Sequence, residues 1–258
     1  MDAIILAGGI PQPGEPLYPF TRGISKAMLE ISGKPMVQWI LDALSGAKSI
    51  ENVFIVGLAS DTNLQFARKL SFIPAQSGFV DNIRAAAKKS AEITPVAKYL
   101  LLVSADIPAV TSAMIDRVVR STQGQNLDIH YNVISKEVME KRFPGAHRTY
   151  LHLKELDFCG GDTHVMSLRL LLEDDMEVWR TFTAARKSPL KQASLIGFDT
   201  IFLYLFRLLT LKLAETKLMK RLKVTGKVVI SSDAEIGMDV DKPRHLEIMT
   251  AYLQERHG

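Results

Sequence analysis

The sequence predicts an α/β fold in which helices cover a mainly parallel central sheet. The prediction starts from three short apolar runs, Ala3–Leu6, Val53–Val56 and Tyr99–Val103, which have the length and composition of buried strands. Stretches with helical spacing of apolar residues separate these runs, and strands that alternate with helices form parallel sheets with right-handed crossovers. Ligands of such sheets bind at the carboxyl ends of the strands, so site residues are expected there.

The composition suits a globular enzyme of anionic substrates. The 258 residues are 47% hydrophobic and 23% charged, near the average of globular proteins, and a single α/β domain of this length is ordinary. The net charge of +4 is mild, so it does not demand nucleic acid as a partner. The single cysteine, Cys159, excludes an internal disulfide and fits a reducing, cytoplasmic location. Met1 leads directly into the first strand, so no signal peptide is expected.

The opening stretch carries the clearest ligand-binding pattern. Ala3–Leu6 ends at Gly8-Gly9, and glycines without a Cβ let backbone N–H groups approach an anionic or planar ligand closely. The proline-rich loop that follows is irregular but stiff, and it presents Lys26 as a candidate phosphate ligand. Neither the P-loop pattern GxxxxGK[ST] nor the dinucleotide pattern GxGxxG is present. Strand and glycines alone also fit an ordinary turn between a strand and a helix.

The other elements are predicted in chain order from their spacing. Helical spacing predicts helices at Met36–Ala47, Thr62–Leu70, Phe79–Ile93, Thr111–Ser121, His164–Leu172 and Asp174–Ala185, and a last helix after Pro243. Apolar runs predict further strands at Phe72-Ile73, Leu127–Val133 and Lys227–Ile230. The stretch Ser135–Tyr150 is expected to be rich in loops.

Asp106 is the first candidate metal ligand. It follows Tyr99–Val103, the most strand-like segment of the chain, in the sequence Ser-Ala-Asp-Ile-Pro. A carboxylate at the end of a buried central strand is costly unless a positive charge meets it. Mg²⁺ fits, because proteins hold it with one or two carboxylates and leave its other positions to water and phosphate. The alternative is that Asp106 only caps the turn before Pro108.

The stretch LAGG, followed by PLYPFTRGISKAMLEISGKPM, resembles the signature of nucleotidyltransferases with a GT-A-like, Rossmann-type fold, which include MobA-like proteins and sugar-phosphate nucleotidylyltransferases. The resemblance implies one α/β/α domain over residues 1–258, with a helical insertion at about 164–222 and a helical C-terminal elaboration. In this family the LAGG backbone surrounds the nucleotide base, a lysine grips the triphosphate, and a later loop encloses the base. By resemblance the nucleotide-binding residues are Leu6, Ala7, Gly8, Gly9, Lys26, Ser77 and Gly78.

The resemblance also implies a metal pair and an acceptor site. The sequence Asp-Val-Asp-Lys-Pro is similar to a family element whose second aspartate joins the strand-end aspartate on Mg²⁺, so the implied metal ligands are Asp106 and Asp241. Locally, Asp241 also fits a helix N-cap before Pro243. Relatives contact the acceptor with a Gly-Gly-Asn segment, which falls on Gly160, Gly161 and Asp162 with aspartate in place of asparagine. A strand-end turn would equally explain the two glycines.

The residues that would bind pyrophosphate and the acceptor phosphate match the family pattern less well. Where the family usually has a glycine and an arginine soon after LAGG, this chain has Ile10–Glu15, and Arg22 is a candidate substitute for holding pyrophosphate. Lys187, in the basic end of a predicted helix, is a candidate ligand of the acceptor phosphate, although basic residues are common in last turns for dipole reasons.

The segment 195–222 is unusually apolar and basic. Asp199, Arg207 and Lys212 interrupt any apolar run long enough to span a membrane. A buried helix with a solvated basic face, or a dimer contact, is favoured over contact of residues 198–223 with a membrane surface. Nucleic-acid binding is not expected, because the basic residues lack the aromatic interleaving of a base-stacking surface.

Together with the resemblance, these residues predict a Mg²⁺-dependent nucleotidyltransferase, with Lys26, Asp106 and Asp241 as catalytic residues. It would transfer a nucleoside monophosphate from an NTP to a phosphorylated small-molecule acceptor, such as a sugar, polyol or cofactor phosphate, and release pyrophosphate. Two alternatives are a glycosyltransferase that uses a nucleotide sugar, although Ser104-Ala105-Asp106 matches its DxD motif poorly, and an inactive nucleotide-binding module. The pattern selects neither the NTP nor the acceptor.

Overall fold

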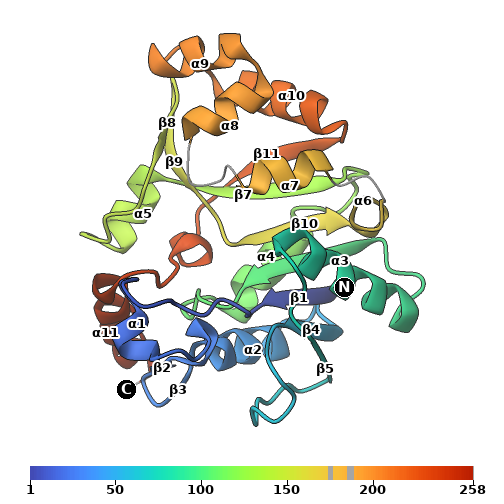
Figure 1. The fold of residues 1–258 in the computed structure, drawn as a ribbon, viewed down its shortest axis with the longest axis vertical. Coiled ribbons are helices and arrows are strands. Elements are labelled where there is room, and N and C mark those ends of the chain that lie inside the picture. Colours follow the sequence, from blue (N-terminus) through green and yellow to red (C-terminus); the bar gives the residue numbers. More distant parts are fainter. Residues whose placement is uncertain (174–176, 185–188, 258) are drawn as a thin grey trace.

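The structure is a computed structural model that describes residues 1–173, 177–184 and 189–257, and it is built on one large sheet with helices on both faces (Figure 1). Strand β1 (Asp2–Leu6) pairs in parallel with β4 (Asn52–Val56) on one side and β6 (Tyr99–Ser104) on the other. Strand β5 (Lys69–Ile73) extends this parallel part beyond β4. Because helices cover both faces, Ala3–Leu6 of β1 form a continuous apolar run without alternation.

The other half of the sheet is mixed. Strand β10 (Thr163–Ser167) runs antiparallel to both β6 and β7 (Ile129–Ser135), so β7 again points in the direction of β6. Strand β11 (Gly226–Ser231) pairs with β7 in parallel, while β9 (Asp157–Gly160) and β8 (Leu151–His152) continue the sheet in antiparallel fashion. Among the strands of this sheet in the described ranges, all but β9 and β10 run one way. The predicted α/β class with a mostly parallel sheet is confirmed.

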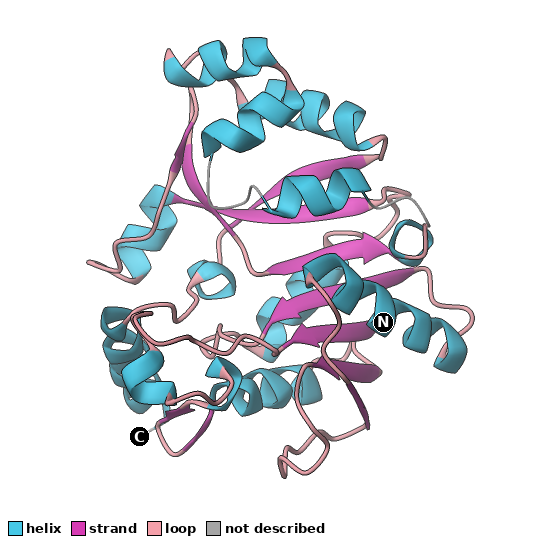
Figure 2. Ribbon diagram, in the orientation of Figure 1, coloured by secondary structure: helices cyan, strands magenta, loops and turns pink. Residues whose placement is uncertain are grey.

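Helices close a separate core on each face of the parallel half (Figure 2). One face carries α2 (Met36–Gly46), α4 (Ser112–Arg120) and α11 (Pro243–His257), and the other carries α3 (Phe79–Ile93) and α6 (Leu168–Leu171). Ile4 and Ile5 are both fully buried, one in each core, because neighbouring side chains on a strand point to opposite faces. The shorter elements are α1 (Tyr18–Thr21), η1 (Lys26–Met28), α5 (Lys136–Arg142), η2 (Ala234–Gly237), β2 (Glu30–Ile31) and β3 (Lys34–Pro35).

A group of helices lies over the mixed half of the sheet, at the top of Figure 1. It consists of α7 (Glu177–Ala184), α8 (Pro189–Ile196), α9 (Phe198–Leu205) and α10 (Leu211–Leu222). A third apolar cluster, around Val133, Phe158 and Leu209, joins the segment from α9 to α10 to the sheet. Arg207 breaks the helix between α9 and α10 with a φ of +54°. Among the described residues, no helix is both long and apolar enough to cross a membrane.

The helix predicted at Thr62–Leu70 is wrong, because a loop occupies most of this stretch and leads into β5. Asn63 has a φ of +54°, which a continuous right-handed helix does not allow. The Arg68 guanidinium donates to the carbonyl oxygens of Leu44 (2.7 Å) and Ser45 (3.1 Å). Carbonyls in the last turn of a helix have no partner within it, so Arg68 fixes the loop to the end of α2.

The helix predicted at His164–Leu172 is wrong in its first half, where the chain forms β10. Pairing with strands on both sides decides the conformation, and the His164 ring stacks on Tyr131 of β7 with centroids 4.2 Å apart. The helical part is limited to α6, which Ser167 caps by accepting from Leu170 N (3.3 Å). The stretch predicted to be rich in loops contains α5, which Ser135 caps in the same way.

The turns that follow β1 and β4 contact each other through Gly8 and Gly57. Gly57 has a φ of +95°, and a Cβ placed on it would lie 2.4 Å from the Cα of Gly8. The LAGG turn and the turn after β4 therefore depend on a glycine at position 57 both for its backbone angle and for the close approach.

We expect Gly57→Ala to lower the free energy of unfolding by roughly 2–4 kcal/mol, since it adds backbone strain and a clash with backbone atoms. Gly14→Ala is the matched control, because Gly14 has a similar φ of +93° but no atom within 4 Å of an added Cβ. Its loss should be about 1 kcal/mol, from strain alone. Chemical denaturation measures both, and equal losses would contradict a contact between the two turns.

Candidate functional site

Asp106 lies directly after β6 at the carboxyl edge of the parallel strands. Its Oδ1 accepts a hydrogen bond from Ser104 Oγ (2.5 Å), and its side chain is 11% exposed. Its carbonyl oxygen accepts from the N–H of Val240 (2.9 Å). This backbone contact brings the segment before α11 to the end of β6. A mostly buried carboxylate at this point requires a positive partner.

Lys26 supplies that positive charge. Its Nζ lies 2.5 Å from Asp106 Oδ2 and also forms an ion pair with Asp241 Oδ1. The backbone holds the lysine in place, because Lys26 N donates to Gly9 O (2.8 Å) and Ser25 Oγ donates to Ala7 O (2.5 Å). Burial alone would lower the pKa of Lys26, but the carboxylates of Asp106 and Asp241 raise it above the ordinary value. The side chain therefore carries a positive charge at neutral pH.

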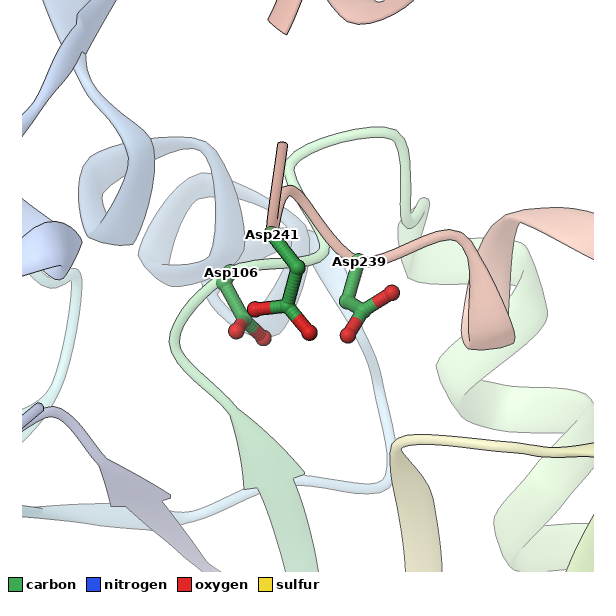
Figure 3. A group of neighbouring side chains, drawn as sticks. All are labelled: Asp106, Asp239 and Asp241. Atoms are coloured by element: carbon green, nitrogen blue, oxygen red, sulfur yellow. The ribbon is translucent and has the colours of Figure 1, made fainter. Parts of the chain in front are cut away.

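Three aspartates converge at the end of β6 (Figure 3). Asp106, Asp239 and Asp241 each offer a carboxylate oxygen, and the three oxygens lie within 4.8 Å of one another. The fold thus unites Asp106 and Asp241, as the sequence pattern predicts for a shared metal. Burial would raise the pKa of Asp241, but the neighbouring Lys26 ammonium lowers it below the ordinary value. Asp239 was missed by the sequence reasoning, although it is the first aspartate of the same Asp-Val-Asp motif.

Asp162 and Arg148 complete the charged group. Arg148 forms an ion pair with Asp239, and each of these side chains is 13% exposed. Asp162 precedes β10, and its carbonyl oxygen accepts from Ser104 N (2.9 Å). Its Oδ2 is buried and accepts no hydrogen bond within the part of the chain that the structure describes. Burial, followed by the negative charge of Asp106, raises the pKa of Asp162 to about 7.

The residues present fit a divalent cation. The described site holds four carboxylates and two cations, namely Asp106, Asp162, Asp239 and Asp241 against Lys26 and Arg148. Two negative charges are therefore left without a compensating cation when all four carboxylates are ionised. Carboxylate oxygens are the ligands that Mg²⁺ and Ca²⁺ prefer. The buried Oδ2 of Asp162 has no hydrogen-bond donor among the described residues, so it is an oxygen that a bound cation could contact.

The LAGG turn lies beside this charged group. Leu6, at the end of β1, is followed by Ala7, whose N–H donates to Val56 O (2.9 Å) on the neighbouring strand. Gly8 and Gly9 are exposed, and a Cβ on Gly9 would meet no atom within 4 Å. Their backbone therefore borders open space next to Lys26, as a binding turn requires. Arg22 ends α1, where its side chain is exposed.

Ser77 and Gly78 lie at the start of α3, in the loop that approaches the LAGG turn. A Cβ on Gly8 would lie 3.9 Å from the Cβ of Ala75, which makes the two loops neighbours. Ser77 Oγ donates to Asp81 Oδ2 (2.6 Å), and this bond is the main cause of the lowered pKa of Asp81. A cavity of about 490 Å³ extends from Ser77 and Gly78 across the first turn of α3 to α7.

The predicted acceptor residues lie on the β10 side of the site. Gly161 N donates to Asn132 O (2.9 Å), and a Cβ on Gly161 would lie 2.9 Å from the same oxygen, so the close approach requires glycine. This contact positions Asp162 between β6 and β7. Lys187 lies outside the described residues. Arg148 was not predicted, because nothing in His147-Arg148-Thr149 marks it as part of a site.

Comparisons with known proteins agree on one class. The sequence model of the MobA-like NTP transferase domain matches residues 3–173. A glucose-1-phosphate thymidylyltransferase of Neisseria meningitidis is 41% identical over 70 residues, which are 27% of this chain and 23% of that protein. The match thus spans about a quarter of that relative's length.

Two solved structures resemble the whole fold. A hypothetical transferase from Thermus thermophilus superimposes with a TM-score of 0.78 and is 30% identical, covering 95% of this chain and 98% of its own. A 4-diphosphocytidyl-2C-methyl-D-erythritol synthase from Anaerococcus prevotii has a TM-score of 0.58 at 12% identity, covering 98% of this chain and 95% of its own. The second likeness concerns the fold alone.

The raised pKa of Asp162 has a consequence for stability without a divalent cation. An acid whose pKa rises from 3.8 to about 7 on folding holds its proton in the folded state over that range, so stability falls as pH rises through it. We expect Asp162→Asn to gain stability relative to the unsubstituted protein between pH ~4 and ~7, by at most about 1.4 kcal/mol per pH unit.

Denaturant unfolding in the presence of a chelator measures this difference at each pH. Asp61→Asn is the control, because Asp61 is exposed and its substitution should give a flat difference. A flat difference for Asp162→Asn as well would mean that the carboxyl of Asp162 is not held protonated by burial.

Proposed function

The chain belongs to the family of MobA-like NTP transferase domains, and from this membership we propose that it transfers a nucleoside monophosphate from an NTP to a phosphorylated small molecule, with release of pyrophosphate. The observation that carries the proposal is the meeting of Lys26 with Asp106 and Asp241 beside the open LAGG turn. One cation and several carboxylates next to the exposed backbone of Gly8 and Gly9 suit a triphosphate with its metal.

The nucleotide is proposed to bind along the loops that follow β1 and β5. The backbone of residues 6–9 would contact the base, and Ser77 and Gly78 would enclose it from the start of α3. The neighbouring positions of these loops and the cavity beside Ser77 support this assignment. Backbone groups would make most of the contacts with the base, so the side chains do not indicate which NTP the protein prefers.

Mg²⁺ is the proposed cofactor, with Asp106 and Asp241 as its ligands and Asp239 as a third candidate. When bound, the ion would neutralise charge on the reacting phosphates and orient them. The chain's own contribution is to hold these carboxylates at fixed positions. Val240 N does so by fixing the Asp239–Asp241 segment to the carbonyl of Asp106, and Arg148 does so by pairing with Asp239.

Lys26 is the proposed ligand of the triphosphate. Its ammonium already lies at the carboxylate group, and its raised pKa keeps it charged. It would stabilise the negative charge that builds on the leaving pyrophosphate, while the backbone bond from Lys26 N to Gly9 O keeps it beside the nucleotide turn. The acceptor phosphate is already ionised at neutral pH, so the reaction needs positioning and charge neutralisation and no general base.

The acceptor is proposed to bind on the β10 side, near Gly161 and Asp162, with Lys187 as a further candidate. Asp162 can accept hydrogen bonds from sugar or polyol hydroxyls, which supports a hydroxylated phosphate ester as acceptor. The partial match to a glucose-1-phosphate thymidylyltransferase supports the same substrate class. A cytoplasmic location would give the protein access to such metabolites.

A pyrophosphate-release assay with Mg²⁺, each of the four NTPs and a panel of sugar and polyol phosphates tests the proposal. Release with one NTP and one acceptor is the expected result. Production of nucleoside diphosphate from a nucleotide sugar would instead assign a glycosyltransferase. Nucleotide binding without any turnover across a broad panel would assign a binding module.

Asp106→Asn should reduce the rate of pyrophosphate release by at least about 100-fold, since it removes a charge at the reacting phosphates. The substitution is nearly isosteric and the Ser104 hydroxyl can still donate to the remaining carbonyl oxygen, so the fold should persist by circular dichroism. Asp61→Asn, on the exposed surface, should leave the rate unchanged. Full activity of Asp106→Asn would refute the role of this carboxylate.

A further inference from the structure

The end of the helical group carries an exposed apolar patch. Of the twelve large apolar side chains that are exposed among the described residues, five fall within a short stretch of the chain: Phe202, Leu205, Phe206, Leu208 and Leu213. Phe202 and Phe206 are 63% and 71% exposed. Single exposed apolar residues are ordinary, but five in a stretch of a dozen residues mark an interaction surface. We call these five residues the α9–α10 patch.

The patch is the outer side of elements whose inner side is already packed. Leu203 and Tyr204 of α9 pack against the third apolar cluster, together with the buried Leu209. Phe202 and Leu205, on the same helix, point away from it and are exposed. Figure 1 shows α9 at the end of the molecule farthest from α2 and β5. Nothing in the described chain covers this outer side, so it is available to a partner.

Charge selects the kind of partner. Residues 198–223 carry six basic and two acidic side chains, a net charge of +4 that equals the net charge of the whole chain. The two acidic residues are already paired, Asp199 with Lys217 (2.5 Å) and Glu215 with Lys212 (2.7 Å). Arg207 lies within the patch, between Phe206 and Leu208, and is exposed. The segment that carries the patch therefore also carries the net positive charge of the chain.

We propose that the α9–α10 patch docks on an anionic lipid membrane surface, with its aromatic and leucine side chains in the headgroup region and the basic residues against lipid phosphates. Exposed apolar residues bordered by lysine and arginine are the composition of helices that lie in a membrane interface. A second copy of the chain is a poorer partner, because it would bring +4 against +4 across the contact. The patch also lies outside residues 3–173, the part that matches the family model.

Co-sedimentation of the full chain with vesicles tests the docking. Vesicles of phosphatidylcholine with phosphatidylglycerol should bring the protein down, and vesicles of phosphatidylcholine alone should do so much less. Phe202→Ser with Phe206→Ser should weaken binding by at least about tenfold, because each substitution removes a phenyl ring that would be buried in the headgroup region. Lys220→Gln with Lys223→Gln should weaken it by about thirtyfold at low salt, and added salt should remove this difference.

Matched surface substitutions control for general effects. Val96→Ser removes an apolar side chain that is 85% exposed and lies outside the helical group. Lys88→Gln with Lys98→Gln removes two exposed positive charges that also lie outside this group. These variants should bind vesicles like the unsubstituted protein. No binding to anionic vesicles, or equal losses in patch and control variants, would overturn the proposal. The proposal would also be overturned if sedimentation velocity showed a dimer of the unsubstituted protein that only the patch substitutions dissociate.

The docking stands apart from the proposed reaction. Pyrophosphate release with a water-soluble acceptor and no vesicles should be the same for the patch variants and the unsubstituted protein. Vesicle binding without turnover would therefore count against the reaction only, and turnover without vesicle binding against the docking only.

Discussion

The ion pairs of Lys26 with Asp106 and Asp241 hold together three distant parts of the chain. Lys26 and Asp241 are 215 positions apart in the sequence, yet their side chains meet at the end of β6. Burying one carboxylate without a partner is strongly unfavourable, so the Lys26 ammonium offsets the cost of burying Asp106. The Asp241 side chain is 54% exposed, and it adds a second carboxylate to the same ammonium. The same requirement explains why the site holds Arg148 beside Asp239.

Backbone hydrogen bonds let the protein keep so many like charges close together. Ser104 N donates to Asp162 O (2.9 Å), Asp162 N donates to Ile236 O (2.7 Å), and Val240 N donates to Asp106 O (2.9 Å). These bonds tie the end of β6 and the start of β10 to the segment that carries Asp239 and Asp241. The carboxylates are thus held by main-chain contacts that do not depend on their own charge, which is the pre-organisation that a metal or phosphate site needs.

The strands β1, β4, β6, β7 and β11 could be predicted from the sequence, whereas β8, β9 and β10 could not. The β1 strand, the α3 helix and Asp106 follow from local patterns, because buried strands and amphipathic helices have distinctive spacing. The β10 strand could not be predicted in this way, because its apolar residues also fit a helix. Only its pairing with β6 and β7 determines that the segment is a strand. Arg148 lies in a stretch without periodicity, so its role depends on contacts with Asp239 that no local pattern encodes.

The position of Asp239 and Asp241 in the chain constrains how the site comes into being. Protein synthesis proceeds from the amino terminus, so β1, β6 and Lys26 emerge well before the Asp-Val-Asp segment does. Until residue 241 has left the ribosome, Lys26 has only Asp106 as a partner in this group, so the cluster of three aspartates is incomplete. The contacts of Asp239 and Asp241 therefore form late, and the early folding of the sheet proceeds without them.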